Sequence, residues 1–174
     1  MQKITFILIL ALAFMSACKT EPPMDTNPLL VAYNTPFEIA PFDKIKPAHF
    51  MPAFEAGIEQ QQQNIKAIAE NPEAPTFENT IEALEYSNPL LTKVSSVFYN
   101  LTGANTNDSL KAIAQQVAPL LSKLSDDIYL NESLFLRIKT LYDNKEKLNL
   151  NKEQAMLLEK KHKAFVRGGA NLPA

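Results

Sequence analysis

The amino-acid sequence predicts an all-α fold of antiparallel helices. Apolar residues recur every three or four positions through most of the chain, which is the spacing of one face of an α-helix. Asparagine, threonine or proline precedes these stripes, and such residues cap or begin helices. Because no segment alternates apolar and polar residues over the length of a strand and the loops are short, we expect consecutive helices to pack as antiparallel neighbours. A solenoid is a weaker alternative, since no internal repeat is evident.

The first 17 residues have the character of a secretory signal. Lys3 is followed by an uncharged apolar run from Ile4 to Met15, which is too short to span a bilayer. The junction Met15-Ser16-Ala17-Cys18 resembles a bacterial lipobox, in which the cysteine is lipidated after cleavage in front of it. We therefore predict a lipoprotein-type signal peptide over residues 1–17. An ordinary signal peptide followed by an accidental cysteine is the alternative.

Lipidation of Cys18 would attach the mature protein to a membrane of the cell envelope. Lys19 follows the cysteine where an aspartate would favour the inner membrane, so we expect the outer membrane. Removal of the signal takes only Lys3 from the 17 Lys and Arg residues and none of the 19 Asp and Glu residues. This slightly acidic balance, without a basic cluster, argues against nucleic acid as a partner.

Residues 18–43 are predicted to form a tether and an arm. Five prolines prevent a regular helix there: Pro22, Pro23, Pro28, Pro36 and Pro41. The same segment is too apolar for a purely solvated linker, because it also contains Leu29, Leu30, Val31, Phe37, Ile39 and Phe42. We therefore expect an apolar arm that lies across the helical body.

Residues 44–174 are predicted to form the helical domain. Pro47 stands at the first position of a helix that continues to about Glu70, and a glutamine run from Gln60 to Gln63 is interpreted as part of its solvated face. The densest apolar stripe follows, in a helix capped by Thr76. This stripe consists of Phe77, Ile81, Leu84, Leu91, Val94, Phe98 and Leu101.

The role of Pro89 in that central helix has two possible interpretations. Pro89 lies within the stripe, where we interpret it as a kink, and the alternative is that it starts a new helix after Asn88. Gly103 is expected to close the helix in a left-handed turn. Three more helices then complete the domain. The first begins at Asn107-Asp108 and is expected to bend at Pro119, and the second begins at the cap Asn131. The third begins at the capping pair Asn151 and Gln154 and ends at Gly168-Gly169.

Residues with catalytic or metal-binding chemistry are few. His49 and His162 lie in different predicted helices, and neither begins a His-Glu-x-x-His motif. Glu159 and His162 have the i, i+3 spacing with which a helix offers two ligands to one metal, but they stand among lysines. A solvated, mixed-charge face is the favoured interpretation for residues 159–162, and a surface or half-buried position is expected for His49. We assign no catalytic and no metal-binding residue.

Six segments carry a resemblance to a known family. They are NPLLV at 27–31, PFDKIKPAHFMPAFEAG at 41–57, FENTIEALE at 77–85, LLTKVSSVFYNLTGANTND at 90–108, DDIYLNESLFLRI at 126–138 and KAFVRGGANL at 163–172. Together they make the chain from Asn27 to Ala170 similar to the N-terminal part of the thimet oligopeptidase (M3) family of zinc metallopeptidases, and especially of its bacterial peptidyl-dipeptidases. The resemblance implies the N-terminal helical part of a larger, two-lobed enzyme whose channel admits short peptides.

The same resemblance implies where the chemistry lies. In this family zinc is held by a His-Glu-x-x-His helix and a later glutamate, and none of these residues is present here. We therefore expect a fragment, truncated before the zinc-binding domain and inactive alone, that helps to wall the channel of an enzyme releasing dipeptides from peptide C-termini. Its expected partners are the remainder of the polypeptide, short peptides, and a membrane through Cys18. The alternative is a stand-alone, non-catalytic helical lipoprotein that binds peptides or a protein partner.

Overall fold

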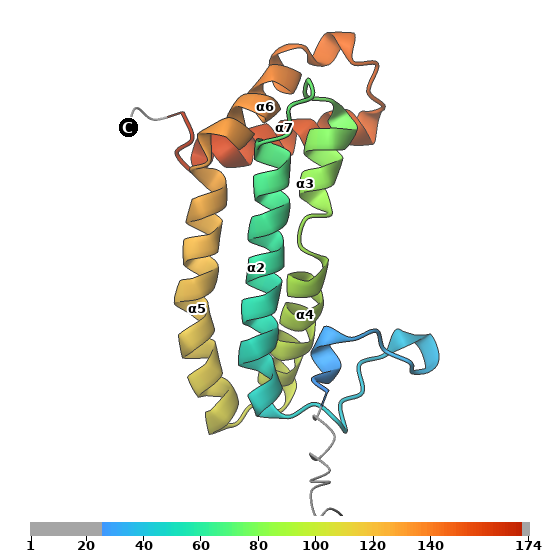
Figure 1. The fold of residues 1–174 in the computed structure, drawn as a ribbon, viewed down its shortest axis with the longest axis vertical. Helices are drawn as coiled ribbons and strands as arrows, with labels where there is room; N and C mark the ends of the chain where they lie inside the picture. Colours follow the sequence, from blue (N-terminus) through green and yellow to red (C-terminus); the bar gives the residue numbers. More distant parts are fainter. Residues whose placement is uncertain (1–25, 172–174) are drawn as a thin grey trace, which may run out of the picture.

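Helix α2, Phe50–Ala69, is the central helix of the structure, a computed structural model that describes residues 26–171. Two more helices, α4 (Pro89–Ala104) and α5 (Asp108–Tyr129), also run along the long axis of the molecule, as α2 does. α2 packs against each of them (Figure 1). A loop of three residues, 105–107, joins α4 to α5 and makes them antiparallel, as predicted.

Two further helices lie across one end of the bundle of α2, α4 and α5 (Figure 1). α6, Glu132–Asp143, and α7, Lys152–Arg167, pack against each other there (Figure 1). The remaining elements are short: 3-10 turns at Pro28–Leu30 (η2), Pro36–Glu38 (η3), Pro47–His49 (η4) and Lys145–Lys147 (η6), a π-helix at Phe77–Glu82 (η5), and α3 at Ala83–Glu85. All regular structure between residues 26 and 171 is helical, which confirms the all-α prediction. No helix in this range is both long and apolar enough to cross a bilayer.

The predicted caps are present because short polar side chains satisfy the free amides of a helix start. The side chains of Asn107, Asn131 and Asn151 each accept a hydrogen bond from the amide three residues later, at 3.0, 2.9 and 2.9 Å. The Gln154 side chain in turn accepts from the amide of Asn151 at 3.1 Å, which completes the predicted capping pair. Thr76 caps the π-helix in the same way, at 3.1 Å from the amide of Asn79.

The predicted kink at Pro89 is wrong, because the chain breaks there and Pro89 is the first residue of α4. The break spans residues 86–88 and keeps its polar groups paired. Ser87 donates its hydroxyl to the Leu84 carbonyl at 2.8 Å, and the Asn64 amide of α2 donates to the Ser87 carbonyl at 2.8 Å. Proline lacks an amide hydrogen and would clash with an earlier turn, so a new start costs less than a continued helix.

The predicted helix end at Gly103 is also wrong. Gly103 lies inside α4 and is exposed, and the helix ends one residue later at Ala104 without a left-handed residue. The prediction for the last helix is confirmed, since α7 ends at Arg167 and is followed by Gly169 with a φ of 100°. Glycine adopts that conformation without steric cost.

The buried residues form two cores that meet along α2. The long-helix core joins the first half of α2 to α4 and α5, and consists of Leu29, Phe50, Ala53, Phe54, Leu91, Val94, Val97, Phe98, Leu110, Ile113, Val117 and Leu124. The end core joins the second half of α2 to the π-helix, α3, α6 and α7, and consists of Ile65, Ile68, Phe77, Ile81, Leu84, Leu134, Ile138, Leu141, Leu158 and Phe165. Each large side chain buried in these cores stabilises the fold by roughly 1.5–3 kcal/mol.

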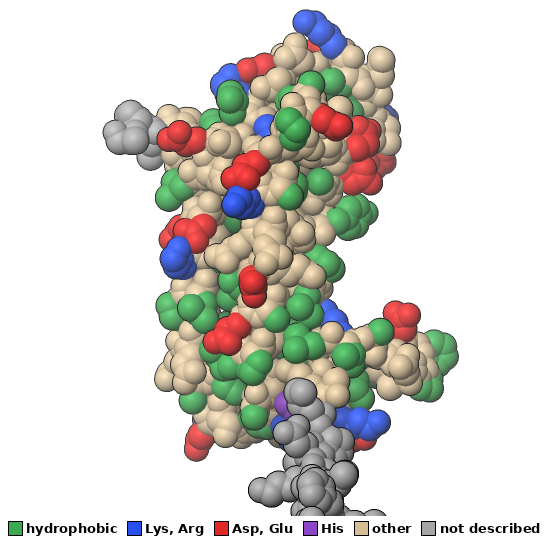
Figure 2. Space-filling view, viewed as in Figure 1, with side chains coloured by type: hydrophobic (Ala, Val, Ile, Leu, Met, Phe, Trp, Pro, Cys, Tyr) green, Lys and Arg blue, Asp and Glu red, His purple; other side chains and the backbone are tan. Residues whose placement is uncertain are grey.

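The N-terminal arm contacts the body at its start and again at Ala40, which packs against the long-helix core. Leu29 is fully buried, and the Lys93 ammonium of α4 donates to the Val31 carbonyl at 2.5 Å and lies 4.0 Å from the centre of the Tyr33 ring. Beyond Tyr33 the arm extends away from the helices, and hydrophobic side chains gather at its tip (Figures 1 and 2). Phe37 at this tip is 94% exposed with a φ of 58°. The prediction that the arm lies across the body is therefore wrong for residues 34–39, which project from it, and holds for the contacts at Leu29, Tyr33 and Ala40.

Candidate functional site

A groove opens where α3 ends and α4 begins. Its volume is about 610 Å³, and it lies between the two cores. Side chains from α2, α3, α4, α5 and α7 line it: Gln61, Leu84, Glu85, Ser87, Asn88, Leu91, Thr92, Leu121, Leu124, Ser125, Ile128, Tyr129, Lys161 and Phe165. The groove exists because the break at residues 86–88 separates α3 from α4 beside α2.

Gln61 and Ser87 are the buried polar residues that line this groove, and the Ser87 hydroxyl is already paired with the Leu84 carbonyl. Gln61 is 9% exposed, although the sequence analysis placed it on a solvated face with its neighbours. The run continues the apolar stripe of α2, since Gln61 stands seven residues after Phe54, four before Ile65 and seven before Ile68. That register is the signal that could have identified Gln61 as inward-facing. Its carboxamide makes no hydrogen bond to any residue in the range 26–171.

The charged side chains of the groove are paired with each other. The Lys161 ammonium of α7 lies 2.5 Å from a carboxylate oxygen of Glu85, which ends α3. Their side chains are 27% and 45% exposed, so the pair contributes modestly to stability. It does join α7 to α3 across the groove, and it leaves the lining without a net charge.

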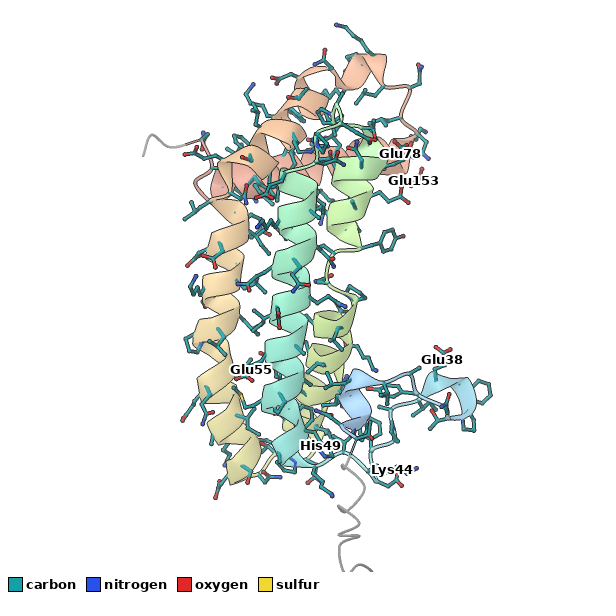
Figure 3. All side chains as sticks on the ribbon, in the orientation of Figure 1. Glu38, Lys44, His49, Glu55, Glu78 and Glu153 are labelled. Carbon is teal, nitrogen blue, oxygen red and sulfur yellow. The ribbon has the colours of Figure 1, made fainter. Side chains whose placement is uncertain are left out.

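His49 has a structural position far from the groove. It is 8% exposed, rather than at the surface or half-buried as predicted, and its Nδ1 accepts the backbone amide of Lys46 at 3.1 Å. The side-chain amide of Asn27 donates to the His49 carbonyl at 2.8 Å, which connects the arm to the start of α2. Figure 3 shows His49 and Lys44 at one end of the molecule, and Glu78 and Glu153 at the other.

The pair Glu159 and His162 does not form a metal site in the structure. The imidazole of His162 stacks on the ring of Tyr142 with centroids 3.9 Å apart, and burial lowers the pKa of His162 below its ordinary value. Glu159 and Lys160 are exposed, as the solvated-face interpretation predicts, whereas Lys161 and His162 are half-buried. Within residues 26–171 no group of three or more metal-binding side chains gathers. Cys18, the predicted lipidation site, lies outside the described residues.

Comparison with known proteins relates this chain to bacterial and eukaryotic peptidases. It is 44% identical over 146 residues to dipeptidyl carboxypeptidase of Escherichia coli (strain K12), covering 84% of this chain and 21% of that protein. Oligopeptidase A of the same organism is 29% identical over 148 residues, covering 85% and 21%. Thimet-like oligopeptidase of Dictyostelium discoideum is 31% identical over 121 residues, covering 67% and 18%. No family model matches the chain.

The chain spans about a fifth of the length of the curated relatives it matches. The alignments cover most of the described helices, so the likeness extends over the whole fold and is not confined to one motif. The chain therefore belongs to the thimet oligopeptidase (M3) family, of which it represents an N-terminal region.

Proposed function

We propose that this chain is the N-terminal helical part of a zinc-dependent peptidyl-dipeptidase, which releases dipeptides from the C-termini of short peptides. The observation that carries this proposal is the 44% identity over 146 residues to a dipeptidyl carboxypeptidase. Identity at this level along the chain favours a shared role for these helices over a shared fold alone. The names of these relatives identify them as peptidases.

Zinc would be held by the remainder of the longer protein. The described residues do not fit the metal, since His49 accepts a backbone amide and His162 stacks on Tyr142. A peptidase zinc site needs three protein ligands close together, and no such group exists between residues 26 and 171. When bound elsewhere in the polypeptide, zinc would activate the water that attacks the peptide bond.

The described helices would form a rigid part of the substrate channel wall. Two packed cores hold α2, α4 and α5 in place, and the groove beside the α3–α4 break presents apolar groups, uncharged polar groups and one ion pair. These groups suit a peptide, whose backbone carries amides and whose side chains are partly apolar. The partners in this proposal are short peptides and the remainder of the polypeptide.

The predicted anchor would hold the enzyme in the cell envelope, at the outer membrane. This part of the proposal rests on the sequence of residues 1–19, with lipidation at Cys18. Radiolabelled palmitate should be incorporated into the native protein and should be lost in Cys18→Ala. Absence of label in the native protein, or label that persists in the variant, would contradict lipidation at this residue.

The mass and activity of the native protein test the catalytic proposal. An antibody against residues 77–108 would capture the protein from its own cells for intact mass measurement and for assay on a short peptide with a free C-terminus. We expect a mass several times that of this chain and dipeptide release that stops with a zinc chelator. A mass equal to the lipidated chain, with no hydrolysis, would contradict the proposal and favour the stand-alone peptide-binding or partner-binding lipoprotein.

A further inference from the structure

We infer that the groove at the α3–α4 break is a binding site for an extended peptide segment, with Gln61 pairing to the peptide backbone and one apolar side chain seated beside it. This inference deepens the proposed function and rests on it for the class of ligand. It adds the place on these helices where the peptide binds and the residue that recognises its backbone.

The side-chain carboxamide of Gln61 is the first observation that supports a peptide site. Gln61 is 9% exposed, and its carboxamide has no hydrogen-bond partner among residues 26–171. It is not one of the fully buried unpaired groups, which in this range are the Tyr33 hydroxyl and the Arg137 Nε, so it opens onto the groove, where a ligand can reach it. A carboxamide offers an acceptor oxygen and donor hydrogens side by side. A peptide bond presents the matching donor and acceptor, so an extended backbone can satisfy both groups of Gln61.

The apolar lining is the second argument. Leu84, Leu91, Leu124, Ile128 and Phe165 face the same groove as Gln61, and they come from α3, α4, α5 and α7. The volume of about 610 Å³ lies within the range of roughly 300–1,000 Å³ that is usual for ligand pockets. A side chain such as leucine would be removed from water there while its backbone reaches Gln61.

The charge of the groove lining is the third observation, because it disfavours multiply charged anionic ligands. Glu85 and Lys161 are the charged residues of the groove, and they form an ion pair at 2.5 Å. A multiply charged ligand such as a nucleotide is usually held by an excess of positive charge. The described lining has no such excess, so an uncharged, partly apolar peptide segment suits it better.

The test uses matched glutamine variants on one helix. Gln61→Met keeps the length of the side chain and removes its hydrogen-bonding groups. Gln62→Met makes the same change one residue later, at an exposed position outside the groove. The probe is the pentapeptide Ala-Ala-Leu-Ala-Ala, acetylated and amidated so that it carries no charge, and all-alanine pentapeptide with the same blocked ends is the comparison.

Binding would be measured by NMR titration of the full chain labelled with ¹⁵N. We expect saturable shifts of the Gln61 side-chain amide and of backbone amides in residues 84–92. The affinity should fall about five- to tenfold in Gln61→Met, as for a lost hydrogen bond to a buried group, and stay unchanged in Gln62→Met. The all-alanine probe should bind at least tenfold more weakly, because it buries less apolar surface. No saturable shift, or equal affinities in the two variants, would overturn the inference.

A second measurement separates this inference from the proposed function. In the longer native protein, Gln61→Met should raise KM for a leucine-containing peptide about five- to tenfold with kcat retained, as for lost uniform binding. Chelator-sensitive hydrolysis with an unchanged KM would overturn the groove as a peptide site and leave the peptidase function standing. Peptide binding by the chain without any hydrolysis in the longer protein would overturn the function and leave the groove standing. Probe binding by this chain that disappears in the longer protein would show that another segment of the polypeptide fills the groove, and would also overturn the inference.

Discussion

Arg137 of α6 provides a sharp test of how the end core is held together. Its guanidinium donates hydrogen bonds to the carbonyl oxygens of Asn71 and Glu73 at 2.9 and 3.0 Å, and to the side-chain oxygen of Asn79 at 2.9 Å. The residue is 8% exposed. These contacts connect α6 to the loop between α2 and the π-helix, across more than 55 residues of sequence. Asn79 also accepts the backbone amide of Thr76 at 2.8 Å, so the same oxygen serves the cap of the π-helix.

The expected cost of Arg137→Met follows from these contacts. A hydrogen bond to a charged group contributes about 1.5–3 kcal/mol, so three of them set an upper limit of roughly 4.5–9 kcal/mol. The real cost is lower because Glu73 is exposed and Asn71 is half-buried, which lets water reach their carbonyls in the variant. Methionine keeps the apolar stem, and the buried Nε of Arg137 has no partner in the described residues, so its removal costs nothing. We expect a loss of about 2–4 kcal/mol.

Urea unfolding followed by circular dichroism at 222 nm would measure this loss. Arg137→Lys should recover less than half of it, because a lysine ammonium cannot reproduce the forked geometry of a guanidinium. Lys139→Met, at an exposed position on the same helix, is the matched control and should change the stability by less than about 0.5 kcal/mol. If Arg137→Met were as stable as this control, the hydrogen bonds would not hold the end core together.

Three further predictions concern the buried residues Phe98 and Gly57 and the half-buried His162. Phe98→Ala should cost about 3–5 kcal/mol in urea unfolding, because the ring is fully buried. Gly57→Ala should cost about 1–3 kcal/mol in the same assay, since a Cβ there would lie 3.0 Å from the Leu91 Cα where α2 meets α4. Burial lowers the pKa of His162, so the unfolded state binds protons more readily and stability should fall as the pH drops from above the ordinary pKa of 6.5 through the folded pKa. His162→Phe keeps a ring against Tyr142 and should reduce this pH dependence in unfolding curves.

Matched controls make each of these results decisive. Tyr86 is 73% exposed, and Tyr86→Ala should be near neutral; an equally small effect of Phe98→Ala would mean that Phe98 is not a core residue. Nothing lies within 4 Å of a Cβ added at Gly103, so Gly103→Ala should stabilise α4 by up to about 1 kcal/mol. Equal behaviour of the two glycine variants would contradict a close approach at Gly57. An unchanged pH profile in His162→Phe would show that another group causes the pH dependence.

The helix starts could be predicted from sequence because capping is a local interaction. Asn107, Asn131 and Asn151 bond to amides three residues away, and no distant residue is needed to place them. The core position of Phe98 was also predictable, since its spacing from Val94 and Leu91 marks one face of a helix. These features depend on the order of nearby residues alone.

The site was harder to predict, because it depends on residues that are distant in sequence. Gln61 stands among four glutamines, and the packing of α4, α5 and α7 around α2 shows that it lines a groove. Glu85 and Lys161 lie on separate helices, and their pairing needs the crossing of α7 over the end of the bundle. The register of Gln61 with Phe54 and Ile65 was the signal available in the sequence, and it indicates an inward position without indicating a groove.

Apolar spacing and hydrogen bonds within one turn are enough to predict most helix starts, their caps and the large apolar residues of the two cores, because these features depend on nearby residues alone. The tertiary structure was needed to show that Pro89 starts a helix instead of kinking one, that residues 34–39 of the arm project from the body, and that Gln61 faces a groove. In each case the local sequence is compatible with more than one arrangement. The Asn64 amide at the Ser87 carbonyl, the Lys93 ammonium at the Val31 carbonyl, and the apolar walls around Gln61 select between them, and these contacts join parts of the chain that only the fold brings together.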